Sequence, residues 1–243
     1  MIRQLFILLA CFMTIPAFAS PLVGDISQYR IEMDANFNGT RLFLYGARND
    51  VGDVVVVVRG PSKHYMLRKK EPVGGIWVNR ARMKLYDVPG FYAIASSKPL
   101  DDIDASALFA RLKIGLPNLF TPPASSFTLA RHNEFTAALI EYQQQRRLYT
   151  AEPVSLKFMG EMLFKATIEF PDTIPQGEYT AEMYLLRDGE IAGLQSIPIT
   201  VNKTGVDAFL YNFAHQSPFL YGITAVLLAL AAGWFTGRWF ERR

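Results

Sequence analysis

The sequence predicts a mainly β protein: an immunoglobulin-like β-sandwich with a helical insertion, followed by one C-terminal transmembrane helix. Short apolar runs with turn residues about every ten positions are typical of a sandwich. Between two such β segments, residues 101–149 show helical spacing of their apolar side chains. Near the C-terminus, an apolar run has the length of about 20 residues that crosses a bilayer.

Residues 1–19 have the features of a secretory signal peptide. Arg3 gives a positive start, residues 5–15 are apolar but too few to span a bilayer, and Ala17-Phe18-Ala19 fits the cleavage pattern. An alternative is a lipoprotein in which Cys11 is acylated. Cys11 is the only cysteine, so the mature chain would have no thiol for a disulfide or a zinc cluster. This favours a bacterial periplasmic location for the β-rich domain, residues 20–204.

The first β segment is divided by turn signals. Asn38-Gly39 precedes the first apolar run, Gly74-Gly75 separates two later strands, and Pro89-Gly90 introduces the last. The continuous valine run 54–58 is typical of a strand that is buried on both faces. The predicted strands lie at residues 42–47, 54–58, 65–68, 76–79 and 91–95.

Two helices are predicted in the insertion. The first covers residues 101–114, with three aspartates in its first turn and Gly115 after its end. The second begins at Asn133, a suitable N-cap, and continues to Tyr149 with apolar residues at helical spacing.

The second β segment has the clearest alternation. Apolar and polar residues alternate at 164–170 and again at 177–185, and Asp188-Gly189 then turns the chain into a strand around 197–201. We expect three neighbouring antiparallel strands. The turn and strand at 175–181 echo those at 89–93, which indicates either two sandwich modules or a chance similarity.

The C-terminal part predicts attachment to a membrane. Apolar residues of 205–217 share one helical face, which predicts a juxtamembrane amphipathic helix, and residues 218–240 form the transmembrane helix. Arg238 and the arginines of the tail, 241–243, place the C-terminus in the cytoplasm by the positive-inside rule. The predicted location is therefore the bacterial inner membrane, with the lipid bilayer as one partner.

Small residues recur every fourth position within the membrane helix. Such a stripe lets another helix approach closely, so we interpret it as a helix-packing face; the alternative is that it faces lipid. Its members are Ala225, Ala229, Gly233 and Gly237.

The sequence gives no sign of an enzyme. His64, His132 and His215, interpreted as surface residues, accompany no nucleophile motif. Neither a metal site nor a cofactor site is expected. The net charge is only +3 and the basic residues are spread along the chain, so nucleic acid is not expected as a partner.

One cluster of basic residues contains a tryptophan. It could form a cationic patch that binds an anion or an acidic partner loop. The alternative is a set of solvated strand faces with Trp77 in the core. The patch residues are Arg59, Arg68, Lys69, Trp77 and Arg80.

Several motifs resemble a family of transmembrane proteins named Alph_Pro_TM. They are Val58-Arg59-Gly60-Pro61, Arg68-Lys69-Lys70-Glu71, Gly75-Ile76-Trp77-Val78-Asn79, Phe91-Tyr92-Ala93, Leu186-Arg187-Asp188-Gly189, and Tyr211-Asn212-Phe213-Ala214-His215 with Gly233-Trp234. The resemblance implies a bacterial accessory protein of a permease of the sulfite-exporter type (TauE/SafE), and brings no catalytic residues. We therefore expect an interaction subunit of an anion permease; the alternative is a membrane-tethered domain that binds or senses an anion.

Overall fold

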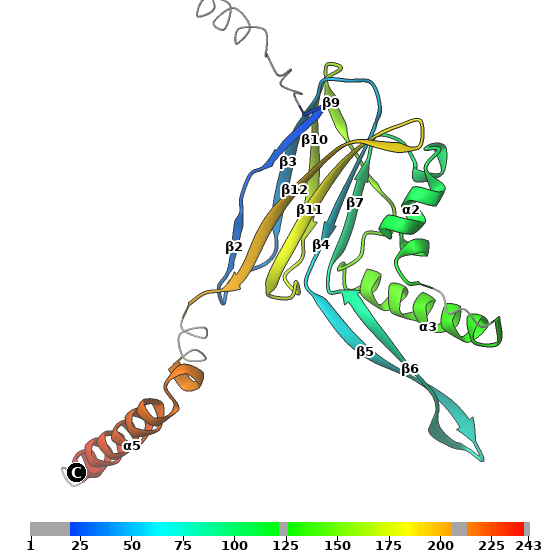
Figure 1. Cartoon of the computed structure of the whole chain (residues 1–243). Coiled ribbons are helices and arrows are strands. Elements are labelled where there is room, and N and C mark those ends of the chain that lie inside the picture. Colours follow the sequence, from blue (N-terminus) through cyan, green and yellow to red (C-terminus); the bar gives the residue numbers. More distant parts are fainter. Residues whose placement is uncertain (1–19, 122–125, 206–212, 241–243) are drawn as a thin grey trace, which may run out of the picture.

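The computed structural model describes residues 20–121, 126–205 and 213–240 (Figure 1). It is mainly β, with two packed sheets, a projecting two-stranded ribbon, a helical insertion and a C-terminal helix, which confirms the predicted fold class. The immunoglobulin-like designation stays a prediction. The predicted signal peptide, the tail and residues 206–212 of the predicted juxtamembrane helix lie outside the described residues, whereas residues 213–216 are helical.

The first sheet is antiparallel and has four strands in the order β1-β3-β10-β9. In β10 the alternating residues Phe164, Ala166, Ile168 and Phe170 are buried, as its pattern predicts. The strands are β1 (Leu22–Ile26), β3 (Thr40–Arg48), β10 (Leu163–Phe170) and β9 (Lys157–Met159).

The second sheet has six strands in the order β2-β12-β11-β4-β7-β8. Its inner pairs are antiparallel, and the edge pairs β2–β12 and β7–β8 are parallel. All five residues of the run Val54 to Val58 are fully buried, which confirms a strand covered on both faces. The strands are β2 (Arg30–Met33), β12 (Glu190–Lys203), β11 (Gly177–Arg187), β4 (Asp53–Arg59), β7 (Tyr92–Ser96) and β8 (Val154–Ser155).

The prediction of three neighbouring antiparallel strands is wrong for the first of them. β11 and β12 do form a hairpin, but β10 pairs with β3 and β9 in the other sheet. Residues 171–176 carry the chain between the sheets, and Ile174 is buried at this crossing. The alternating pattern shows which side chains face the core. Because a strand of either sheet would show the same alternation, the pattern cannot tell to which sheet β10 belongs.

The two similar turn-and-strand segments belong to one sheet and meet at their turns. The strands that follow them, β7 and β11, flank β4 on its two sides. The rings of Phe91 and Tyr179 are 5.8 Å apart between centroids, and a Cβ added at Gly90 would approach the Pro175 ring to 2.9 Å. The similarity therefore belongs to two strands of one sheet.

β5 (Ser62–Val73) and β6 (Ile76–Pro89) form a separate antiparallel ribbon that projects from the sandwich, and we call it the arm (Figure 1). Both strands are longer than predicted. Gly74 and Gly75 close the arm with φ of 58° and 84°, as a type I′ turn requires. β5 continues from β4, and β6 leads into β7, so the arm is an extension of the central hairpin of the second sheet.

The helical insertion differs from its prediction. The single helix expected at 101–114 is divided into η1 (Leu100–Asp102) and α2 (Ser106–Leu112), because Ile103 and Ala105 between them turn into the core. η2 (Leu116–Asn118) follows. α3 (Ser126–Gln145) begins before Asn133, which therefore lies inside the helix, and ends before Tyr149.

The last helix is α5 (Pro218–Phe240), which coincides with the predicted 218–240. It provides one candidate membrane span among the described residues, Pro218–Arg238, and none of that span is buried against the rest of the chain.

Candidate functional site

The five predicted patch residues do not lie together. Arg68 and Lys69 are on β5 and Trp77 and Arg80 are on β6, so four of them belong to the arm. The side chain of Arg80 lies outside the described part, but its backbone occupies the bulge opposite Lys69 and Lys70. Arg59 ends β4 inside the sandwich.

Arg59 connects the insertion to the second sheet. Its guanidinium forms an ion pair with Glu182 of β11, and its Nη2 donates to the carbonyl oxygens of Leu112 at 2.8 Å and Lys113 at 3.3 Å. The side chain is 23% exposed. Glu182 balances its charge and the carbonyls occupy its donors, so Arg59 holds the C-terminal end of α2 against β4 and β11.

The inner face of the arm packs on α3. Leu85 and Val88 of β6 form a small buried cluster with Leu139 of α3, and Tyr65, Leu67 and Met83 lie against it. Lys69 forms an ion pair with Glu134 of α3, and hydrogen bonding to this carboxylate raises the pKa of Lys69. These contacts hold the arm against the insertion from its root, where it joins β4 and β7, outward as far as Lys69.

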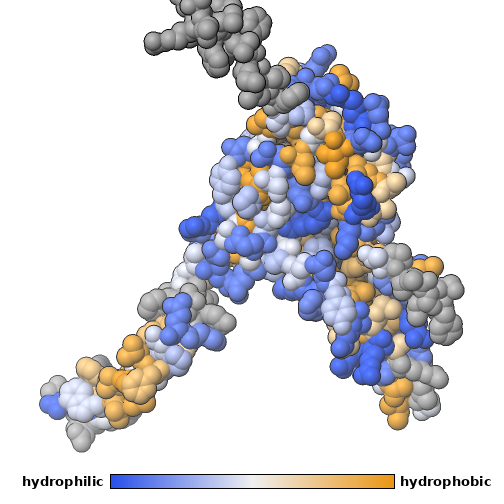
Figure 2. All heavy atoms as spheres, in the orientation of Figure 1, coloured by the Kyte–Doolittle hydropathy of each residue, from blue (hydrophilic) through white to orange (hydrophobic). Residues whose placement is uncertain are grey.

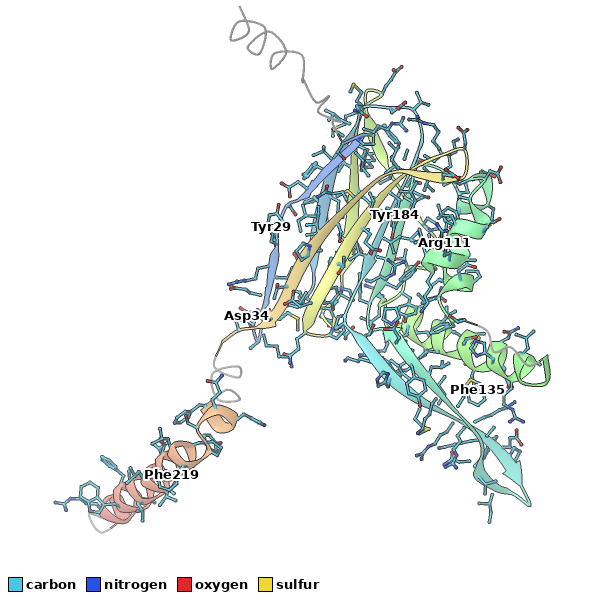
Figure 3. All side chains as sticks on the ribbon, in the orientation of Figure 1. Tyr29, Asp34, Arg111, Phe135, Tyr184 and Phe219 are labelled. Carbon is cyan, nitrogen blue, oxygen red and sulfur yellow. The ribbon has the colours of Figure 1, made fainter. Side chains whose placement is uncertain are left out.

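A shallow apolar cavity of about 210 Å³ lies between the arm and α3. Its walls include Leu67 of the arm and Phe135 of α3, and Figure 3 labels Phe135 beside the arm. Lys69 and Glu134, at its rim, pair with each other. This cavity suits an apolar group better than an inorganic anion.

The outer face of the arm carries exposed cations. The ladder places Arg68 directly opposite Arg82, and Met66 opposite Lys84. Nearer the root, the rings of His64 and Tyr86 meet edge to face with centroids 5.2 Å apart. All six side chains are exposed. We call this set the cationic face: His64, Met66, Arg68, Arg82, Lys84 and Tyr86.

The cationic face has an unbalanced charge. Like charges directly opposite each other destabilise a strand pair, and in the described part of the chain no carboxylate pairs with Arg68, Arg82 or Lys84. The arm holds seven Lys and Arg residues against Glu71 and Asp87, so it is more positive than the whole chain at +3. The arm is therefore the positive pole of the molecule, where an acidic partner would be attracted.

The tip of the arm, which we define as residues 70–79, exposes apolar side chains after its turn. Ile76 is 69% exposed and Trp77 is 68% exposed, so the alternative that places Trp77 in the core is wrong. Figure 2 shows apolar surface at the far end of the arm. Lys70 is exposed within the same segment.

The arm and the chain to α5 leave the sandwich at the same end. Arg59, where β4 leads into the arm, lies opposite Thr180 at the start of β11. Gly177, three residues earlier on β11, lies opposite Val201 at the end of β12, which leads to α5. Figure 1 shows both segments leaving this end.

The small-residue stripe on α5 has no partner within the described chain. Ala225, Ala229, Gly233 and Gly237 are all exposed, and a Cβ added at either glycine meets nothing within 4 Å. A neighbouring helix could therefore approach this face closely.

The three histidines belong to different elements. His132 is buried in α3 with 8% exposure, so its interpretation as a surface residue is wrong. His64 is exposed on the cationic face, and His215 is exposed in the helical turn 213–216 before α5. Among the described residues, no group of three His, Cys, Asp or Glu side chains is placed to hold a metal.

Sequence patterns could not identify the whole cationic face. Counting outward from the Gly74-Gly75 turn pairs residue 68 with residue 81, whereas the bulge at Arg80 shifts the pairing and brings Arg82 opposite Arg68. Met66, Lys84, His64 and Tyr86 could have been found only from the true length of the strands.

Two comparisons with known proteins complete this description. Residues 21–242 match the model of a family described as "Putative transmembrane protein (Alph_Pro_TM)". A search of curated proteins found no match.

Proposed function

The chain belongs to the Alph_Pro_TM family of transmembrane proteins, and from this premise we propose that it is an accessory subunit of an integral membrane protein. One observation carries the proposal. The arm, which carries the exposed and unbalanced cationic face, leaves the sandwich at one end. The chain continues from the same end to a candidate membrane helix. An integral membrane partner would be within reach of both the cationic face and α5.

In this proposal the two surfaces act together. α5 packs against a partner helix through its small-residue stripe, and the cationic face contacts acidic loops of the same partner outside the bilayer. Tethering by α5 raises the effective concentration of the second contact, so neither contact needs to be strong alone.

We propose a permease as the partner, by extension of the family resemblance, and a sulfite or organosulfur anion exporter as its class. The proposed location is the bacterial inner membrane, with the sandwich in the periplasm and the C-terminus in the cytoplasm. The proposal assigns no catalytic residue and no cofactor.

Binding or sensing of a small anion is the second candidate, favoured by the juxtaposition of Arg68 and Arg82. Two further observations count against it. Arg59 and Lys69 already have carboxylate partners, and the cavity beside Lys69 is mainly apolar. The candidate predicts a thermal shift of the full chain in detergent with sulfite, sulfate or a sulfonate, and it fails if none of these raises the melting temperature.

Affinity purification from crosslinked membranes tests the accessory role. We expect one integral membrane protein to be recovered with the full chain. Arg68→Glu with Arg82→Glu, or Ala229→Leu with Gly233→Leu, would reduce its recovery several-fold.

Matched controls separate these surfaces from general effects. Arg30→Glu with Lys157→Glu reverses two exposed charges on strands outside the arm, and Ala231→Leu enlarges a small residue away from the stripe. Both controls should retain the partner. Equal recovery with all four variants would contradict the proposal.

A further inference from the structure

We propose that the tip of the arm lies in the headgroup layer of the membrane that α5 crosses, as a second anchor that does not span the bilayer. The occupant of the exposed tip is thus the lipid surface, with its phosphates and its interfacial zone. The inference rests on the proposed function only in requiring that α5 spans a membrane, and it needs no protein partner.

The geometry brings the tip towards the membrane. The arm leaves from the end of the sandwich at which β12 continues towards α5. The twelve residues of β5 extend the tip about 40 Å from the root at ~3.3 Å per residue. The chain between Lys203 and Pro218 spans at most roughly 45–50 Å. The tip and the start of α5 can therefore reach the same plane.

The side chains of the tip suit an interface better than water. Ile76 and Trp77 are each more than two-thirds exposed and follow the turn at the end of the arm, beyond its outermost contact with α3, the ion pair of Lys69 with Glu134. Tryptophan concentrates at the headgroup level, where its ring is partly shielded from water and its N–H can donate a hydrogen bond.

The outer part of the arm carries a net positive charge that complements lipid phosphates: residues 68–82 hold five Lys and Arg residues against one carboxylate, Glu71. Lys70 is exposed within the tip, and Arg68 and Arg82 face outward on the part of the arm that follows it. Basic residues close to a membrane surface are attracted to anionic headgroups within about a Debye length, roughly 8–10 Å. Apolar residues at the tip with cations behind them are the arrangement that an interfacial anchor requires.

The backbone of the tip is also suited to this position. The two strands pair without interruption from Lys70 opposite Asn79 to Val73 opposite Ile76, directly before and after the Gly74-Gly75 turn. A two-stranded ribbon alone is only marginally stable in water, so the outer part of the arm gains from a surface that covers its apolar end.

The test uses the full chain in lipid nanodiscs, with Cys11 replaced by serine. Ile76→Cys carries an environment-sensitive fluorophore, and Val51→Cys is the matched control. Val51 is 82% exposed, apolar, and precedes β4 at the opposite end of the sandwich from the root of the arm. The nanodiscs contain phosphatidylethanolamine with phosphatidylglycerol, or phosphatidylcholine alone, with and without a lipid-borne quencher.

We expect blue-shifted emission at position 76 and quenching several-fold stronger than at position 51. Lys70→Glu should weaken the quenching at position 76 in the anionic nanodiscs. The proposal is overturned if the label at position 76 reports water as the label at position 51 does. It is also overturned by a blue shift without lipid quenching, which would mean that protein covers the tip.

The two proposals fail separately. If the label at position 76 is quenched by lipid but no partner is recovered from membranes, the anchor stands and the accessory role does not. If a partner is recovered but the tip remains in water, the accessory role stands and the anchor does not.

Discussion

Arg59 is part of a basic sequence cluster, but its neighbours in space give it a structural role. It reaches Glu182 and two carbonyl oxygens that come from a different element. Arg59→Ala would leave the partly buried Glu182 carboxylate without its cation, with only the Tyr184 hydroxyl donating to it, and would remove the Arg59 donor from both carbonyls. We expect a loss of about 2–4 kcal/mol in the free energy of unfolding, measured by chemical denaturation of the full chain in detergent.

Arg41→Ala is the matched control for this prediction. Arg41 also pairs with a carboxylate, Glu169, but the two side chains are 70% and 80% exposed. Exposed pairs contribute about 0–1 kcal/mol, so this variant should be close to the unaltered chain. Equal losses for both variants would show that Arg59 does not hold α2 in place.

Tyr92 predicts an alkaline limit to stability. Burial raises the pKa of its hydroxyl from the ordinary 10.0 to about 12, and burial also raises the pKa of Tyr149 and Tyr179. Because the folded state disfavours the phenolate, this stability is complete below pH 10. It is lost as the pH rises from about 10 through 12. For Tyr92 the loss is roughly 3 kcal/mol.

Denaturation curves at a series of alkaline pH values check this prediction. The Tyr92 hydroxyl accepts a hydrogen bond from the Gly115 amide at 2.9 Å, so Tyr92→Phe should be less stable at neutral pH. It should also lose less stability above pH 10. The account is wrong if Tyr92→Phe and the unaltered chain lose the same amount in alkali.

At the scale of elements, the arm depends on α3. Leu139 is 2% exposed and forms the contact between α3 and the arm. Leu139→Ala should cost about 2–4 kcal/mol and release the root of the arm. Hydrogen exchange should become faster at the amides of β5 and β6 near Tyr65 and Leu85, and stay slow in β4.

Leu129→Ala provides the comparison, because Leu129 lies on the same helix but is 38% exposed. It should leave exchange in the arm unchanged. If Leu139→Ala changes exchange no more than Leu129→Ala does, α3 does not support the arm.

Elements with a strong local pattern could be predicted from the sequence. The alternation in β10 and β11, the valine run of β4 and the apolar run of α5 are each local, and the structure forms these elements at the expected residues, although β10 belongs to the other sheet. The sequence pattern does not predict the four edge strands, because short edge strands depend on long-range pairing. These strands are β1, β2, β8 and β9. The division of the first insertion helix depends on Ile103 and Ala105 reaching the core, which is a tertiary contact.

The candidate site was predictable only in its outline. Four of the five patch residues share the arm, since they are neighbours in sequence on either side of one glycine turn. Arg59 is the last residue of β4, and only its contacts with β11 and α2 reveal its separate role. The apolar tip and the cationic face become distinct once the exposure of Trp77 and the register of Arg68 with Arg82 are known.

At the scale of the whole molecule, function depends on which surfaces share one end of the sandwich. The arm and the continuation to α5 both leave that end, and the arm holds the unbalanced positive charge. In the proposed accessory role, these surfaces would hold a second membrane protein at the bilayer. The opposite end of the sandwich, with the β11–β12 turn at Asp188-Gly189, points away from the proposed contact with the membrane partner.

The most direct test of this central claim is photocrosslinking in intact cells from the cationic face. A photoreactive amino acid replaces Met66, which is exposed between the arginine pair and the root of the arm; Glu190, exposed at the opposite end of the sandwich, is the control position. The account predicts a crosslink from position 66 to one integral membrane protein, absent from position 190 and lost with Arg68→Glu and Arg82→Glu. Crosslinks only to another copy of this chain, or equal crosslinks from both positions, would contradict it.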